Sequence, residues 1–302
     1  MPERNTNERI HIMGKGLRVV LSEAQAKGSA IGHFNISDIA MLKAVIAAGR
    51  DMKTVVIIGV SEGERTYLGT RQIAAVIRSL RDEINVPIFL NADHTHSLAS
   101  ALEAADAGFD SIVFDNSSLP FENNVKETRQ AAEALKDINP AIFLEGEIGD
   151  IGTGSEIHET ASETGGALTT ADEARQFVQA TSVDALAPAI GNRHGMSRSM
   201  VEGSSRKHLD LARIAEIKAA AGCFLTLHGG SGTEDEDFVG AIHAGINIIH
   251  VNTELRVAWR RGLEKGLAAD SGEVVPYKIL RDATAAVENV VKSRLRLFSG
   301  SS

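Results

Sequence analysis

Residues 87–115 read Pro-Ile-Phe-Leu-Asn-Ala-Asp-His-Thr-His-Ser-Leu-Ala-Ser-Ala-Leu-Glu-Ala-Ala-Asp-Ala-Gly-Phe-Asp-Ser-Ile-Val-Phe-Asp and contain one complete strand–helix–strand unit. The apolar run at 87–91 is typical of a strand that is covered on both faces. The stretch at 97–108 begins with a serine suited to cap a helix and ends on a glycine suited to close it. A second apolar run follows at 111–115. Two short buried strands joined by one helix predict a parallel pair.

The same alternation extends along the chain in both directions. Eight such units favour a closed (β/α)8 barrel, the TIM-barrel form of an α/β fold, over an open doubly wound sheet. No linker or low-complexity stretch divides the chain, so residues 1–302 are expected to form a single domain. The Gly-, Thr- and Glu-rich stretch near 148–170 predicts a long functional loop; a disordered surface insertion is the alternative. The eight apolar runs lie at 30–35, 54–60, 87–91, 111–115, 141–147, 185–190, 224–228 and 247–252.

The composition limits the classes of partner. A formal net charge of −9 disfavours nucleic acid, because phosphate backbones need clustered Lys and Arg. No apolar stretch approaches the roughly 20 residues of a membrane span. The single cysteine, Cys223, cannot form an internal disulfide, which suits a reducing cytoplasm. We therefore expect a cytoplasmic protein with no nucleic-acid and no membrane partner.

Polar side chains follow most of the predicted strands, at the end of a barrel where active sites form. Three of them are histidines, His94, His194 and His228, and three imidazoles meeting from separate strands suit a catalytic zinc with one open position. A histidine near a strand end can instead serve only as a hydrogen-bonding cap, which is our interpretation of His33, His158, His208 and His243. The polar strand-end residues are Asn35, Ser61, Asp93, His94, Asp115, Glu147, His194, His228, Asn252 and Thr253.

Asp93 stands next to one of these histidines. Because neighbouring strand residues point to opposite faces, His94 could hold a metal while Asp93 meets the substrate from another angle. A carboxylate beside a metal-bound carbonyl compound is a natural acid/base, although a carboxylate that merely orients a histidine is the alternative.

Glycine-rich turns follow the other two histidines. The sequences His-Gly-Met-Ser-Arg at 194–198 and His-Gly-Gly-Ser-Gly at 228–232 would let backbone N–H groups approach an anion closely. With Asn252 and Thr253 they could bind a phosphate group, because the loops after the seventh and eighth strands often do so in barrels. Ordinary strand-to-helix turns are the alternative.

Taken together and in order, these motifs resemble the class II, zinc-dependent fructose/tagatose-bisphosphate aldolase family. The resemblance runs from about Gly32 to Phe298. Its carriers are Gly-His-Phe-Asn at 32–35, Asp-His at 93–94, Phe-Asp-Asn-Ser-Ser-Leu-Pro-Phe-Glu-Asn-Asn at 114–124, Glu-Gly-Glu-Ile-Gly at 145–149, Ala-Ile-Gly-Asn-Arg-His-Gly at 189–195, Leu-His-Gly-Gly-Ser-Gly at 227–232 and Val-Asn-Thr-Glu at 251–254.

The resemblance implies reversible aldol cleavage of a phosphorylated ketose to dihydroxyacetone phosphate and an aldehyde. It implies zinc on His94, His194 and His228, with Glu147 as an occasional ligand and Asp93 as the acid/base at the C4 hydroxyl. It also implies a monovalent cation, Na⁺ or K⁺, near the phosphate, and a homodimer or homotetramer. The substrate- and phosphate-binding residues expected are Asn35, Ser61, Gly195, Arg198 (where the family usually has Lys), Gly229, Gly230, Ser231, Asn252 and Thr253.

Three positions depart from the family pattern. The second acid/base, usually a Glu in the loop after the fifth strand, falls near Ser155, so Glu156 is the candidate and Glu159 a further one. His250 replaces an Asn that helps to hold the enediolate. Tyr277 stands where an Arg usually binds the distal phosphate, which makes a ketose 1-phosphate a serious alternative to a bisphosphate. Altered chemistry on a dihydroxyacetone-phosphate-like substrate, and a non-catalytic sugar-phosphate-binding protein, are the alternatives to an aldolase.

Overall fold

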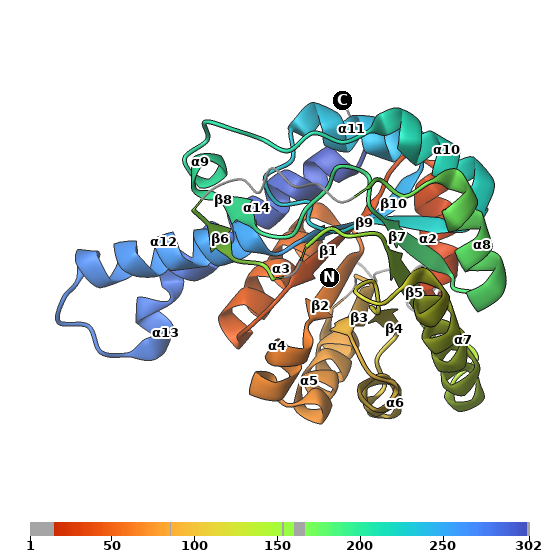
Figure 1. Cartoon of the computed structure of the whole chain (residues 1–302). Helices are drawn as coiled ribbons and strands as arrows, with labels where there is room; N and C mark the ends of the chain where they lie inside the picture. The colour runs from red at the N-terminus through yellow and green to blue at the C-terminus, as the bar shows by residue number, and fades with distance from the viewer. Residues whose placement is uncertain (1–14, 85, 153, 160–166, 301–302) are drawn as a thin grey trace.

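The computed structural model describes residues 15–84, 86–152, 154–159 and 167–300, and its centre is a closed barrel of eight parallel strands (Figure 1). Each strand pairs with the next along the chain, and the last returns to pair with the first. The predicted TIM barrel is therefore confirmed. The barrel strands are β1 (Ile31–Asn35), β2 (Val56–Val60), β3 (Ile88–Thr95), β4 (Ser111–Phe114), β5 (Phe143–Ile148), β7 (Ala185–Pro188), β9 (Phe224–Leu227) and β10 (Ile246–Val251).

Helices surround the barrel and connect its strands (Figure 1). In the strand–helix–strand unit at 87–115, Ser97 accepts a hydrogen bond from the Ser100 N–H and caps helix α6 (Leu98–Ala107). Gly108 ends this helix with a φ of 93°. The helices are α2 (Leu17–Ala26), α3 (Ile39–Met52), α4 (Glu62–Leu68), α5 (Thr70–Glu83), α6 (Leu98–Ala107), α7 (Phe121–Ile138), α8 (Ala171–Thr181), α9 (Arg198–Val201), α10 (Leu211–Ala221), α11 (Asp235–Ala244), α12 (Thr253–Ala269), α13 (Pro276–Ile279) and α14 (Arg281–Phe298).

The amino-terminal end of the barrel is closed by α2. Its Leu17, Val20 and Leu21 pack against a small buried cluster of strand residues that includes Ile57 and Phe143. Arg18 fixes the helix there by donating to both carboxylate oxygens of Asp184, at 2.6 and 2.5 Å. This leaves the carboxyl ends of the strands as the end at which a ligand can enter.

The loop after β5 was predicted to be long. Residues 153 and 160–166 of it lie outside the described part of the chain. The described part runs beside the loop after β7, because β6 (Ile157–His158) pairs with β8 (Met196–Ser197) and the His194 N–H donates to the Ile151 carbonyl. The two loops therefore cover the carboxyl end of the barrel together.

Helices α12 and α13 project away from the barrel as an arm (Figure 1). Three large hydrophobic side chains on this arm are exposed: Leu267 at 47%, Val274 at 81% and Tyr277 at 73%. Among the described residues, no helix combines the length and the apolar character needed to cross a membrane.

Candidate metal centre

A bulge in β3 shapes the site. The register of β3 against β4 shifts between Ala92 and Thr95, and His94 has a φ of 40°. A histidine in this left-handed region is strained, and such strain gathers at functional sites. The bulge breaks the strict alternation expected from the sequence, so that His94 Nε2 lies 3.9 Å from Asp93 Oδ1 and both side chains serve one site.

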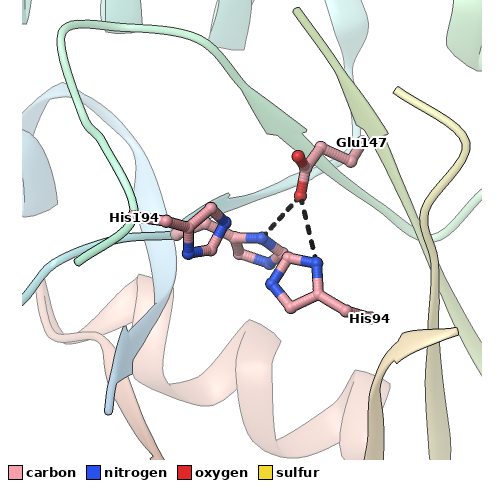
Figure 2. Close-up of side chains that lie close together, drawn as sticks. His94, Glu147 and His194 are labelled. Carbon is pink, nitrogen blue, oxygen red and sulfur yellow. Dashed lines mark ion pairs between the residues drawn. The ribbon is translucent and has the colours of Figure 1, made fainter. Parts of the chain in front are cut away.

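The three predicted histidines meet at the carboxyl end of the barrel. His94 comes from β3, His194 from the loop after β7, and His228 follows β9. The His94 ring centroid lies 4.7 Å from that of His194 and 4.8 Å from that of His228. Glu147 of β5 completes the group, with one potential ligand atom from each residue within 4.8 Å of all the others. Figure 2 shows the rings of His94 and His194 gathered beside the Glu147 carboxylate, with a dashed line marking the His94–Glu147 ion pair.

Three buried atoms of this group fit a bound cation. Glu147 Oε2, His194 Nε2 and His228 Nδ1 have no hydrogen-bond partner among the described residues. Glu147 Oε2 lies only 2.7 Å from His228 Nδ1, yet the two atoms are not oriented to form a hydrogen bond. Buried polar atoms are nearly always paired, and imidazole nitrogens with a carboxylate oxygen are a typical donor set for a divalent metal.

Two further carboxylates orient the histidines. Asp115 Oδ2 lies 2.8 Å from His94 Nδ1, which leaves His94 Nε2 to face the site. Glu145 Oε1 lies 2.6 Å from His228 Nε2, and Thr226 donates to its other oxygen at 2.6 Å. Pairs of this kind fix the ring orientation of metal-binding histidines. Asp115 was predicted only as a polar residue at a strand end, and no role was predicted for Glu145.

Charges in the group are strongly coupled. Burial opposes protonation of His94, but Asp93 and Asp115 raise its pKa to about 9. Burial likewise opposes protonation of His228, yet the carboxylates of Glu145 and Glu147 raise its pKa well above the usual value. Burial, reinforced by these two imidazoles, lowers the pKa of His194. Positive charge is therefore favoured where the carboxylates converge.

Asp93 is buried beside this group. Its Oδ2 accepts a hydrogen bond from Asn35 Nδ2 at 2.8 Å, and its Oδ1 has no hydrogen-bond partner among the described residues. Burial opposes its charge, but His94 and His250 hold the pKa of the Asp93 carboxyl well below its usual range. Asp93 is thus an ionised carboxylate whose Oδ1 is not held by a hydrogen bond among the described residues.

His250 of β10 lies on the other side of Asp93, with its Nδ1 3.3 Å from Asp93 Oδ1. Its ring stacks on His33 of β1 with a centroid separation of 3.5 Å and an angle of 4° between the planes. Burial and the neighbouring imidazoles of His33 and His228 lower the pKa of His250 well below its usual value, so the ring is neutral near pH 7. His33, interpreted from the sequence as a structural cap, therefore packs directly against a candidate site residue.

A cavity joins these side chains to the predicted phosphate-binding loops. Most of the predicted substrate-binding residues line it, together with Ser155 of the long loop. Gly230 lies beneath the surface, where its N–H donates to the His250 carbonyl at 3.2 Å. The lining residues are Asn35, Asp93, His94, Ser155, His194, Gly195, Gly229, Ser231, His250, Asn252 and Thr253.

Besides Gly230, Glu147 and His228, three more of the predicted residues do not line the cavity. Ser61 caps α4 by accepting from the Glu64 N–H. Arg198 is exposed and donates to the carboxylate of Glu159 at 2.6 and 3.2 Å. The Glu156 side chain is exposed, one residue along from the cavity-lining Ser155.

Lys207 was missed by the sequence analysis. It is 6% exposed, and its ammonium group donates to four backbone carbonyls of the loops that carry His194 and His228. No local pattern around Lys207 indicates this role, because the four acceptors are main-chain atoms. The position of Glu145 gave a weak indication of its role, because it lies two residues before Glu147 and therefore points to the same face of β5.

Comparisons with known proteins point to one family. The family model described as class II fructose-bisphosphate aldolase matches residues 15–302. Fructose-bisphosphate aldolase of Thermus caldophilus is 34% identical over 92% of this chain and 96% of that protein. The enzyme of the same name from Geobacillus stearothermophilus is 32% identical over 94% of this chain and 96% of its own length. The crystal structure of the YdjI aldolase from Escherichia coli K12 superposes with a TM-score of 0.78 at 27% identity, covering 93% of this chain and 96% of that one.

Proposed function

The chain belongs to the class II fructose-bisphosphate aldolase family, and from this premise we propose that it cleaves a phosphorylated ketose reversibly to dihydroxyacetone phosphate and an aldehyde. The observation that carries the proposal is the placement of an ionised, buried Asp93 beside three histidines and Glu147. Among the described residues, Glu147 and two of these histidines have buried atoms without a hydrogen-bond partner, which suit a divalent metal.

We propose zinc as the metal, held by His94, His194 and His228, with Glu147 as a fourth ligand when the open position is not taken by substrate. The nitrogen-rich donor set supports zinc over magnesium or calcium, which prefer oxygen ligands. When bound, the metal supplies a Lewis acid that stabilises negative charge on the oxygens of the three-carbon fragment.

In this proposal Asp93 accepts the proton of the C4 hydroxyl group. The C3–C4 bond then breaks, the aldehyde leaves, and the electron pair stays on the three-carbon fragment. Asn35 holds Asp93 in place through its 2.8 Å hydrogen bond, and the lowered pKa of Asp93 keeps the carboxyl group ionised. His250, neutral and next to Asp93, is positioned to donate a hydrogen bond to a substrate oxygen where the family uses an Asn.

The three-carbon fragment must then receive a proton at C3, and Glu156 is our candidate donor. Its neighbour Ser155 lines the cavity, so a short shift of this loop would carry Glu156 toward the substrate. Arg256 supports an ordered loop here, because its guanidinium donates to the Ser155 carbonyl at 3.2 Å and to Glu64 at 2.9 Å.

For the phosphate of the substrate we propose the loops after β7 and β9 together with the start of α12. Among the described residues, the N–H groups of Gly195 and Ser231 donate no hydrogen bond and can meet an anion. Thr253 is the first residue of α12, whose N-terminus favours negative charge, and Asn252 precedes it. Gly229 and Gly230 allow the close backbone approach, and Arg198 can join if it leaves Glu159.

We propose a homodimer or homotetramer as the working assembly. The projecting arm supports this, because Leu267, Val274 and Tyr277 are exposed on it and would be covered in an assembly.

The proposal is tested by a panel of substrates: fructose 1,6-bisphosphate, tagatose 1,6-bisphosphate and ketose 1-phosphates without a C6 phosphate. Because Tyr277 supplies no guanidinium for a distal phosphate, we expect the C6 phosphate to add nothing to kcat/KM, whereas a charge-assisted hydrogen bond to it would add roughly tenfold. A kcat/KM for the bisphosphates roughly tenfold above that for the ketose 1-phosphates would contradict the argument from Tyr277. A metal-loaded protein that cleaves none of them would favour altered chemistry at His250 instead.

A further inference from the structure

The ammonium group of Lys207 is enclosed by main-chain oxygens. Its Nζ lies 2.6 Å from the carbonyls of Arg193, Gly195 and Ser231 and 2.9 Å from that of Gly229. We call these four oxygens the carbonyl cage. An ammonium has three protons and no acceptor, so four oxygens around it share its donors and surround it as they would a small cation.

The backbone of Lys207 is fixed as well. Its N–H donates to the Gly232 carbonyl at 2.8 Å, and its own carbonyl accepts from the Glu234 N–H at 3.3 Å. The side chain therefore starts from a point between α9 and α10 that is tied to the loop after β9, and it is only 6% exposed. Burial lowers the pKa of Lys207 to about 7, and the Glu254 carboxylate opposes this shift. The four carbonyl oxygens accept hydrogen bonds from the ammonium group.

The carbonyl cage belongs to two separate loops. Arg193 and Gly195 flank His194, whereas Gly229 and Ser231 follow directly on His228. The loops come close enough that a Cβ atom on Gly229 would lie 2.2 Å from the Arg193 carbonyl oxygen. Carbonyl oxygens brought together in this way repel one another unless a positive charge lies between them. Lys207 thus contacts both loops that carry a candidate metal ligand and a candidate phosphate donor.

We propose that Lys207 is a positioning residue whose ammonium group serves as a built-in monovalent cation, joining the two loops and giving the phosphate site its buried positive charge. The resemblance of the sequence predicted a separate Na⁺ or K⁺ near the phosphate; with the cage filled by Lys207, phosphate binding requires neither. Arg198 does not supply this charge in the structure, because it is exposed and paired with Glu159. The inference rests on the proposed function only in identifying the anion as the phosphate of the substrate.

The test compares the wild type with Lys207→Ala and Lys207→Met in sodium, potassium, ammonium and choline chloride at constant ionic strength. Lys207→Ala empties the cage, whereas Lys207→Met fills it with an uncharged chain of similar length. Four quantities are measured for each protein: the melting temperature, the affinity for inorganic phosphate by calorimetry, and kcat and KM for ketose phosphate cleavage. Bound metal is quantified in every sample.

We expect the wild type to show no preference among the four salts. In choline, Lys207→Ala should melt at a lower temperature and bind phosphate roughly tenfold more weakly, with the loss mainly in KM, because a charge-assisted contact is removed. Potassium or ammonium should restore both quantities by entering the cage, as a ligand that binds only the folded state does. Lys207→Met should show the same loss without rescue.

Lys218 provides a matched control. It is also partly buried and donates to three acceptors, Gln25, Cys223 and Asn247, but it contacts neither loop. Lys218→Ala should show no response to the salt used. The proposal is overturned if the wild type needs Na⁺ or K⁺ to bind phosphate, or if Lys207→Ala keeps its phosphate affinity in choline. Because melting temperature and phosphate affinity need no turnover, salt rescue in a protein that cleaves no ketose phosphate would count against the proposed function alone.

Discussion

Replacing Asp93 with asparagine is expected to lower kcat for ketose phosphate cleavage by roughly 10²–10⁴-fold, the usual contribution of a general acid/base. Asparagine keeps the shape of the side chain and can still accept the hydrogen bond from Asn35. It cannot take up the proton of the C4 hydroxyl group. Steady-state kinetics on the best substrate of the panel, with metal content and melting temperature measured in parallel, check this expectation.

Asp150 offers a control for the Asp93 experiment. It is exposed, and its carboxylate accepts only the local N–H of Gly152 among the described residues. Asp150→Asn should cleave at the wild-type rate. If Asp93→Asn retained normal kcat with its metal bound, Asp93 would not be the base, and a carboxylate role limited to orienting His94 and His250 would replace it.

Replacing His194 with alanine is expected to remove the metal and with it essentially all cleavage. The Nε2 atom of His194 is buried without a hydrogen-bond partner among the described residues, so the imidazole has no other described role for this nitrogen. His228→Ala should also lose the metal. It should destabilise the fold as well, because Glu145 would be left as a buried carboxylate without its partner, an effect of about 3–5 kcal/mol.

Metal analysis of the dialysed variants is the measurement for this second prediction. His208→Ala is the matched control, because His208 is exposed, pairs with Asp237, and belongs neither to the cavity lining nor to the ligand group. It should keep both metal and activity. Wild-type metal content in His194→Ala would remove His194 from the ligand set and leave His94, His228 and Glu147 as the candidates.

The sequence was most informative about features that are set by residues close together in the chain. Barrel strands are covered on both faces, so each reads as a short apolar run, and the serine and glycine at the ends of α6 mark that helix directly. The strand-end position of Asp93, His94 and His228 also follows from reading each run to its end. The apolar runs and helix ends were sufficient to predict the fold, and the strand-end positions were sufficient to predict most of the candidate metal ligands.

Features that depend on distant partners were not predictable in the same way. The bulge at Asp93 and His94 is a mismatch of register between β3 and β4, which no single strand encodes. The pairing of Glu145 with His228 joins β5 to the end of β9 across the barrel interior. Lys207 is the clearest case, because its four partners are carbonyl groups that any residue would offer.

We propose above all that His94, His194, His228 and Glu147 form a zinc site that supports cleavage of phosphorylated ketoses. Its most direct test is the metal content of the purified wild-type protein, measured together with cleavage activity before and after treatment with a chelator. We expect stoichiometric zinc, loss of cleavage when the chelator removes it, and recovery when zinc is returned. A protein that holds no divalent metal and cleaves ketose phosphates equally well with chelator present would contradict the claim.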